Sequence, residues 1–420
     1  MSEYINNSEK RLKDLIAFSL GMMNGENGKM LIEKYKDAIE NVSPYDMLKL
    51  EDKQMQMGLS PKVIKKDVEK VINVFSRSLE RYEWKKPEEG SFLYFLILEN
   101  EAFTFKLNQI KKIIKSYRGN EKTKFSELKE ELLPRFKEFT LFDYHYIKKE
   151  NILFPYLEKR WKSYRPLKVM WSLHDDIRKS LKELLIILED SDSQWDDFNP
   201  LLGKYFSLVF RMIQKENLII FPISSETVDK KSWEEMYSQS FEYPFPFIET
   251  PQKHKEEELK KQVEGDIPLE EGVPSLEGGD FLLGPGIFNS ETGNLTFEQI
   301  LLVFNNLPVD ITIVDENDKV KFFNNAKDRF FPRSPAIVGR SVSNCHPPES
   351  VHIVEEIVET FKNGTRDKAE FWIQMKGHFI LIQYFALRNK KGEYKGIIEV
   401  SQDATHIRNL KGERRLLNWE

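Results

Sequence analysis

The sequence predicts a multidomain protein with an all-α N-terminal module, a four-helix bundle and a C-terminal α+β domain. The chain has 420 residues, of which 40 % are hydrophobic. One core stops growing at roughly 250–300 residues, so several cores are expected. Apolar residues recur with helical spacing in the first half, whereas those after Leu295 alternate with period two. A charged, Gly/Pro-rich stretch separates the two patterns.

Composition argues against several classes of protein. No stretch approaches the roughly 18 consecutive apolar residues of a membrane span, and the polar N-terminus lacks a signal-peptide core, which predicts a cytoplasmic protein. Cys345 is the single cysteine, so neither an intramolecular disulfide nor a cysteine-based zinc ribbon can form. The formal net charge of −5 comes without a sustained Lys/Arg run, which argues against nucleic acid as a partner.

Helical periodicity dominates the first half of the chain. Residues 1–85 predict a module of short amphipathic helices, one of which begins at Ser60-Pro61, with serine as N-cap and proline in the first turn. Long helical segments with short connections follow, so residues 86–225 are expected to form a four-helix bundle. These segments lie near 91–117, 122–160, 166–190 and 197–221.

The second half changes character. Residues 226–294 lose the periodicity and predict a linker that is partly packed. Residues 295–410 predict an α+β domain, with a helix from Glu349 to Asn363 between the second and third strands, and residues 411–420 form a short tail. The expected strands are VDITIVDE, VKFFN, AEFWIQM, HFILIQYFAL and YKGIIEVSQD.

The predicted bundle repeats a Glu-Asn pair on three of its helices, beginning at Glu99, Glu150 and Glu216. The last two pairs follow a lysine and are followed shortly by Phe-Pro. His145 lies five residues before Glu150, and the third helix contributes His174. Carboxylates and imidazoles that point inward from facing helices build carboxylate-bridged metal sites, so all five are candidate metal ligands.

A less specific interpretation remains open for the same glutamates. Most helical glutamates lie at the surface or pair with lysine within a turn. The bundle also has only two histidines, which is few for a di-iron centre of the oxygen-carrying kind.

The strings HYIKKENILFPYLEKR, VMWSLHDDIRKSL and MIQKENLIIFP resemble the hemerythrin HHE cation-binding domain. The preceding YDMLKLEDKQMQMGLSPKVIKKDVEKVINVF resembles the helical module called domain of unknown function 438. The resemblance implies non-haem iron or another divalent metal, with His145, Glu150, His174 and Glu216 as ligands and Glu99 as a fifth.

The chain departs from the HHE pattern where the family usually has further ligands. Ile72 and Phe75 stand in place of a Cys-x-x-His pair in the first module. Ser91 and Tyr94 stand where two histidines usually begin the first bundle helix. These side chains coordinate divalent metals poorly, so the resemblance implies an altered or lost site.

The order of two strands, helices and three strands, ending in SQDATHIRNL, resembles a PAS domain. The resemblance implies a pocket for a small ligand between the sheet and the long helix, and dimerisation. Phe371, Trp372 and Tyr384 on the predicted strands are expected to form the core or line this pocket.

The segment before the long PAS helix carries Cys345 and His346, and His352 lies inside the helix. These three are candidate cofactor ligands, because haem-binding PAS domains carry their axial histidine on this helix. Cys345 and His346 are also candidate redox- or pH-responsive groups. The alternative is structural, with His346 packed at the surface and His352 an ordinary helix residue.

The chain lacks a nucleotide-binding glycine loop, a nucleophile elbow and a His-Glu-x-x-His motif, so catalysis is not predicted. The predicted function is a cytoplasmic sensory protein. Its PAS domain would sense a small ligand, a redox state or a gas, and would couple to the bundle and a protein partner. The alternative is a non-haem iron protein that handles oxygen or nitric oxide, or another metal-dependent redox protein.

Overall fold

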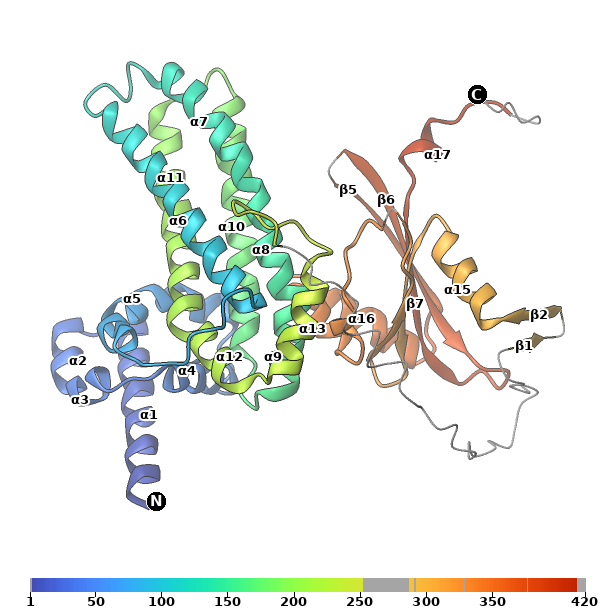
Figure 1. Cartoon of the computed structure of the whole chain (residues 1–420), viewed down its shortest axis with the longest axis horizontal. Helices are drawn as coiled ribbons and strands as arrows, with labels where there is room; N and C mark the ends of the chain where they lie inside the picture. Colours follow the sequence, from blue (N-terminus) through green and yellow to red (C-terminus); the bar gives the residue numbers. More distant parts are fainter. Residues whose placement is uncertain (1, 252–286, 291, 328, 376, 414–420) are drawn as a thin grey trace. The chain divides into compact units, whose positions relative to one another are not determined.

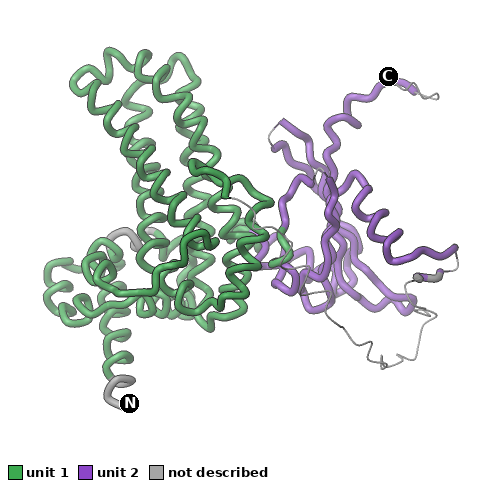
Figure 2. The backbone as a smooth tube through the Cα atoms, in the orientation of Figure 1, with its two compact units in different colours: residues 1–251, 334–336, 347–351 green, residues 252–333, 337–346, 352–420 purple. Residues whose placement is uncertain are grey.

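The computed structural model describes residues 2–251, 287–290, 292–327, 329–375 and 377–413. The chain forms two compact units (Figure 1). Unit 1, green in Figure 2, comprises residues 1–251, 334–336 and 347–351, and unit 2 comprises the remainder. Unit 1 is helical and unit 2 is built around a five-stranded sheet, which confirms the predicted fold class. Within the described residues, no helix is both long enough and apolar enough to cross a membrane.

Five helices form the N-terminal part of unit 1. They are α1 (Ser2–Met23), α2 (Gly28–Lys34), α3 (Lys36–Glu40), α4 (Pro44–Gln56) and α5 (Pro61–Glu80). Helix α4 starts with a capping box, in which Ser43 and Asp46 each bond the other's backbone N–H. Helix α5 begins at the predicted Ser60-Pro61 pair.

The four long helical segments predicted from the periodicity are present. The first is α6 (Phe92–Ser116) and the third is α10 (Pro166–Glu189). The second and fourth are interrupted by short segments of other helix types. The second runs through α7 (Phe125–Phe139), η1 (Thr140–Phe142), α8 (Asp143–Lys148), η2 (Lys149–Leu153) and α9 (Phe154–Arg160). The fourth runs through α11 (Trp195–Lys215), η3 (Glu216–Ile220) and α12 (Phe221–Thr227).

The two Lys-Glu-Asn motifs coincide with π-helical turns. Both η2 and η3 are π-helical, and each leads into a helix with proline as its second residue, Pro155 or Pro222. Proline lacks the N–H that an α-helix needs and its ring crowds the carbonyl four residues earlier. A π-turn accommodates this by inserting one extra residue, and such turns are frequent at functional sites. The two copies of the sequence motif therefore also share the same backbone conformation.

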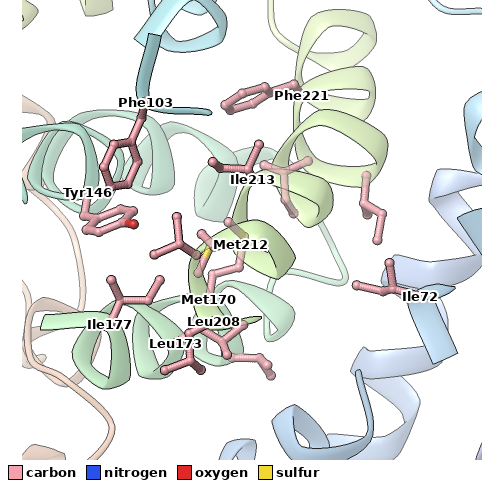
Figure 3. Packing of buried hydrophobic residues seen from close by; sticks show 14 of the residues in the cluster. Ile72, Phe103, Tyr146, Met170, Leu173, Ile177, Leu208, Met212, Ile213 and Phe221 are labelled. Carbon is pink, nitrogen blue, oxygen red and sulfur yellow. The ribbon is translucent and has the colours of Figure 1, made fainter. Parts of the chain in front are cut away.

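Apolar side chains from the N-terminal helices and the bundle share one core. Figure 3 shows Phe103 of α6, Met170 of α10 and Met212 of α11 around the bundle interior, with Ile72 of α5 on the side of the N-terminal helices. All four are at most 1 % exposed. Burial of side chains of this size contributes about 1.5–3 kcal/mol each. The N-terminal helices and the bundle are therefore one packed body.

One buried and one partly exposed charge pair also join these two parts. Lys215 at the end of α11 donates to both carboxylate oxygens of Glu51 on α4, at 2.7 and 2.6 Å. Both side chains are at most 4 % exposed. Lys65 on α5 contacts Asp176 on α10 at 2.6 Å. The Asp176 side chain is 30 % exposed, so only Glu51 is a buried carboxylate, which is costly without a partner; the Lys215 pair therefore fixes α4 against the end of α11.

Replacing Lys215 by methionine should destabilise unit 1, because Glu51 would remain buried without its cation. The expected loss is about 3–5 kcal/mol in the free energy of unfolding, measured by urea denaturation. Lys204→Met is the matched control, since Lys204 is half-exposed and reaches Glu183 at 3.5 Å. It should cost under about 1 kcal/mol. Equal losses in the two variants would contradict the role given to the buried pair.

The segment predicted as a linker begins inside unit 1. Residues 230–240 form α13 (Lys230–Ser240), and the next residues carry buried Tyr243 and Phe245. The Phe247 ring stacks on that of Phe142, with centroids 6.0 Å apart. Aromatic packing thus extends unit 1 to residue 251, while residues 252–286 of the predicted linker lie outside the described residues.

Unit 2 contains a five-stranded antiparallel sheet in the order β4-β3-β7-β6-β5. The elements from residue 287 onward are β1 (Ile287–Ser290), β2 (Gly293–Thr296), α15 (Phe297–Asn306), β3 (Asp310–Asp315), β4 (Val320–Phe323), η4 (Pro335–Ile337), η5 (Val342–Cys345), α16 (Val351–Lys362), β5 (Lys368–Met375), β6 (His378–Arg388), β7 (Tyr394–Asp403) and α17 (Thr405–Asn409). Most of η4 and the first residue of α16 belong to unit 1. The expected strands and helix all appear.

The core of unit 2 lies between the sheet and α16. Val358 and Phe361 of α16 pack with Ile380, Ile382 and Tyr384 of β6. Tyr384 is buried as expected.

Trp372 does not join this core, contrary to expectation, and is 61 % exposed. It pairs with Leu381 on edge strand β5 and therefore points to the sheet face opposite that of its neighbour Phe371, which pairs with core residue Ile382.

Candidate functional site

The bundle brings all five predicted metal ligands together in its interior. Each comes from a different element: Glu99 from α6, His145 from α8, Glu150 from η2, His174 from α10 and Glu216 from η3. All are buried, and none is more than 5 % exposed. We call these five residues the carboxylate–histidine cluster. Hydrogen bonds join them in two groups, His145 with Glu99 and Glu216, and His174 with Glu150.

His145 connects the carboxylates of two facing helices. Its Nδ1 lies 2.7 Å from Glu99 Oε2, and its Nε2 lies 3.1 Å from Glu216 Oε2. The ring stacks on Phe142 with centroids 4.7 Å apart. Both ring nitrogens are therefore engaged by carboxylate oxygens.

Two buried lysines complete this half of the cluster. Lys148 pairs with Glu99 Oε1, and Lys149 pairs with Glu216 Oε1. Neither lysine side chain is exposed at all. Full burial of lysine is rare unless the ammonium is paired. Sequence reasoning did not identify either lysine, although the doubled lysine stands directly before the second Glu-Asn pair.

Glu150 and His174 form the other half of the cluster. His174 Nδ1 lies 2.7 Å from Glu150 Oε1. The Arg178 guanidinium donates to both oxygens of Glu150, at 3.0 Å each, and also reaches Asp143 at 2.6 Å. This bidentate contact is the strongest common geometry between arginine and a carboxylate. It fixes the orientation of Glu150 on the π-turn.

Burial controls the proton equilibria of the cluster. It raises the pKa of Glu99 to about 7, against the opposing effect of Lys148. Burial, followed by the charge of Lys149, holds the pKa of both His145 and His174 well below the usual value. Both imidazoles are therefore neutral near pH 7, and each has a single N–H donor. His145 can donate to only one of its two glutamates, and its other contact needs a proton on the carboxyl, which the raised pKa of Glu99 favours.

The oxygen and nitrogen atoms of the carboxylate–histidine cluster, in their present arrangement, do not fit a metal ion. A metal needs several lone pairs directed at one shared point. Here both nitrogens of His145 face carboxylates, and each carboxylate faces a protein cation. In the part of the chain that the structure describes, no group of three or more His, Cys, Asp or Glu residues could hold a metal ion. The buried Nε2 of His174 has no hydrogen-bond partner among the described residues, but one nitrogen does not make a site.

An open, mostly apolar groove of about 700 Å³ lies between α6 and α11. Asn100 and Asn217 line it. The Asn100 side chain donates to Glu216 Oε2 at 2.7 Å and to Asn217 at 3.3 Å. Asn100 therefore contacts both the groove and a carboxylate of the cluster.

The three candidate ligands of unit 2 do not share one environment. Cys345 ends η5 and is partly buried, with Sγ 3.5 Å from the carbonyl oxygen of Ser341. His346 follows it and is also partly buried.

His352 is exposed in the first turn of α16, and it lies about 200° around the helix from Val354, which packs on the core. An axial haem ligand must face the interior, so this position disfavours His352 in that role.

His346 should make unit 2 sensitive to acid. Burial, with smaller contributions from Arg333 and Arg340, lowers its pKa to about 4. The unfolded chain takes up this proton below about pH 6.5, so stability present above that pH is lost as pH falls toward 4. The loss is at most about 3 kcal/mol. His346→Gln should flatten the dependence between about pH 7 and pH 5 in urea denaturation.

The control for this experiment is His406→Gln, because His406 is an exposed histidine in the same unit. It should leave the acid dependence as in the unsubstituted chain. An unchanged slope in the His346 variant would show that this imidazole does not govern the acid limb.

Comparisons with known proteins match the two main parts of the chain separately. Residues 91–224 match the family described as hemerythrin HHE cation binding domain, and residues 300–405 match a PAS domain family. A comparison with curated proteins finds no match.

Solved structures similar to part of the chain include a C-terminal domain from Streptococcus mutans, at 34 % identity. That match covers 30 % of this chain and 97 % of the other, with a TM-score of 0.29. A sensory box sensor histidine kinase from Vibrio cholerae is 14 % identical, with coverages of 26 % and 92 % and a TM-score of 0.20. The PAS domain of Bordetella pertussis BvgS is 16 % identical, with coverages of 25 % and 84 % and a TM-score of 0.20.

Proposed function

We propose that this chain, which joins a hemerythrin HHE domain to a PAS domain, is a sensory protein whose PAS domain senses a small ligand, a redox change or a gas. The change passes to the helical bundle and from there to a protein partner. The combination of these two domains in one chain carries the proposal. A signal can shift the bundle only through a difference in free energy between two states of the chain.

The PAS core is the part of unit 2 in which such a difference would arise. Residues of α16 and β6 meet there, with Phe361 and Ile380 at most 1 % exposed. Close-packed protein interiors transmit small changes in side-chain volume, because few voids are available to absorb them. A conservative change of volume in this core can therefore stand in for an unknown signal.

Ile380→Val should alter hydrogen–deuterium exchange in the bundle as well as in the PAS domain. The substitution removes one buried methyl group and costs about 0.5–1.5 kcal/mol, which leaves the domain folded. If the domains are coupled, peptides from residues 92–240 of the full chain should change their exchange rates. Ile407→Val is the matched control, because Ile407 is 50 % exposed.

Exchange that changes only within residues 300–405 would argue against coupling between the domains. The control should change neither region. A bundle response in both variants would show that the method does not discriminate a core change from a surface change.

Self-association through the PAS domain is the second part of the proposal. Helix α15 precedes the sheet and exposes an apolar surface, with Phe297, Leu301, Leu302 and Val303 each about half-exposed. Phe304 on the same helix packs on Phe322 of β4, so the helix is attached to its domain. Contiguous exposed apolar residues mark interaction sites. Since PAS domains commonly dimerise, a second copy of this chain is the proposed partner for this surface.

Leu301→Glu combined with Leu302→Glu should convert the dimer to a monomer, because carboxylates would be buried at the interface without partners. Light scattering coupled to size-exclusion chromatography measures the mass directly. Leu410→Glu is the control, since Leu410 is exposed outside α15 and should keep the dimer. A monomeric unsubstituted chain, or a double variant that stays dimeric, would reject this surface.

The hemerythrin match also supports a second candidate function, a non-haem iron protein that handles oxygen or nitric oxide. The ligands would be His145, His174, Glu99, Glu150 and Glu216. The pairing of these carboxylates with lysine and arginine is unfavourable to this function. The sensory proposal does not depend on it.

A further inference from the structure

We propose that the ammonium groups of Lys148 and Lys149 take the place of metal ions in this bundle, so that the folded chain holds its buried carboxylates together without a metal. The inference concerns the composition of the bundle and stands apart from the sensing proposal. It rests on the position of the cations relative to the carboxylate–histidine cluster.

Each carboxylate of the cluster has its own basic partner. Burial lowers the pKa of both lysines, and the opposing effect of neighbouring carboxylates, Glu99 on Lys148 and Glu150 on Lys149, favours the charged form. Lys148 pairs with Glu99, Lys149 pairs with Glu216, and Arg178 pairs with both oxygens of Glu150. Taking a carboxylate out of water is costly unless a positive charge lies close by. In carboxylate-bridged sites the metal supplies this charge. Here side chains of the same polypeptide supply it.

The backbone explains how two consecutive lysines reach two different helices. Neighbouring residues of a helix point about 100° apart. Lys148 ends α8 and contacts Glu99 on α6, whereas Lys149 begins the π-turn η2 and contacts Glu216 on η3. The change from α-helix to π-helix falls between the two lysines. Glu216 itself starts the other π-turn, so both partners of this pair lie on irregular backbone.

Aromatic rings hold the two ammonium groups in a dry position. Lys148 Nζ lies 4.0 Å from the centroid of the Phe245 ring, and Lys149 Nζ lies 4.8 Å from that of Tyr146. Cations are attracted to ring faces, most strongly where water is excluded. The lysines are therefore built into the interior on both sides, by carboxylates and by aromatic faces. Surface lysines that had merely folded inward would lack this second set of contacts.

Metal binding would conflict with this arrangement in two ways. A divalent ion placed between Glu99 and Glu216 would lie beside two ammonium groups, which repel it. It would also need a nitrogen of His145, and both nitrogens already face carboxylate oxygens. A metal could enter only by displacing the lysines from their partners.

Metal content of the full chain tests the proposal directly. Protein made in medium with added iron, manganese and zinc, and purified without chelator, should carry far less than one metal ion per chain. Its melting temperature should not change when EDTA is added. One or two ions per chain that survive dialysis, together with a lower melting temperature in EDTA, would overturn the proposal.

Variants test whether the lysines supply the missing charge. Lys149→Met should lower the melting temperature, because Glu216 loses its cation, and Glu216→Gln in the same chain should restore much of the loss. Lys148→Met with Lys149→Met should melt lower still and should recover on addition of zinc or manganese. Lys122→Met is the control, because Lys122 and its partner Asp196 are both 70 % exposed.

Each result counts for or against the proposal. A Lys149 variant that melts like the control, or that Glu216→Gln does not rescue, would show that the lysine does not compensate this carboxylate. The metal analysis of the unsubstituted chain decides the question even if the double lysine variant fails to fold. None of these results bears on coupling between the domains, which hydrogen exchange measures separately.

Discussion

The interior of the bundle depends on compensation of buried negative charge. Glu99, Glu150 and Glu216 are enclosed by helices on all sides, and each would destabilise the fold if left alone. Cations from α8, η2 and α10 meet them one to one, and His145 links the carboxylates of α6 and η3. Each carboxylate and its cation lie on different elements. The charge network therefore fixes how the helices pack against one another, and it also neutralises the carboxylates.

Irregular backbone makes this network possible. In a continuous α-helix, the side chains after Lys148 would point in other directions around the helix axis. The π-turns η2 and η3 each insert one extra residue, which rotates the side chains that follow. The prolines that follow each turn favour the irregularity, since they cannot make the regular hydrogen bond. Thus a local preference of two short sequences determines which side chains face the centre of the bundle.

Much of this was predictable from sequence, because it follows from periodicity. The four helical segments and the strands of unit 2 follow from side-chain spacing. The structure buries Glu99, His145, Glu150, His174 and Glu216 in the bundle, while their role as metal ligands stays a prediction. The lysines were not predictable in this way. Lysine is expected at the surface, and the sequence shows neither that α8 is enclosed nor which charges face it.

The same limit applies in unit 2. His352 was considered a cofactor ligand from its position on the long helix, but ligation depends on which face of α16 packs on the sheet. The apolar spacing of Val354, Val358 and Phe361 identifies that face, and His352 lies away from it. Trp372 was expected in the core because it is aromatic, whereas its register opposite Leu381 places it on the other side of the sheet. Both cases show that the type of a side chain does not by itself determine which face of the helix or sheet it points to.

The contact between Phe245 and Lys148 has a structural consequence. Phe245 lies six residues before Pro251, where the chain leaves unit 1 on its way to the PAS domain. The ring that contacts one buried lysine therefore lies close to the end of the first described stretch of the chain. Phe247 lies between this ring and Pro251 and stacks on Phe142, so aromatic packing anchors the end of this stretch of unit 1 beside the charge network.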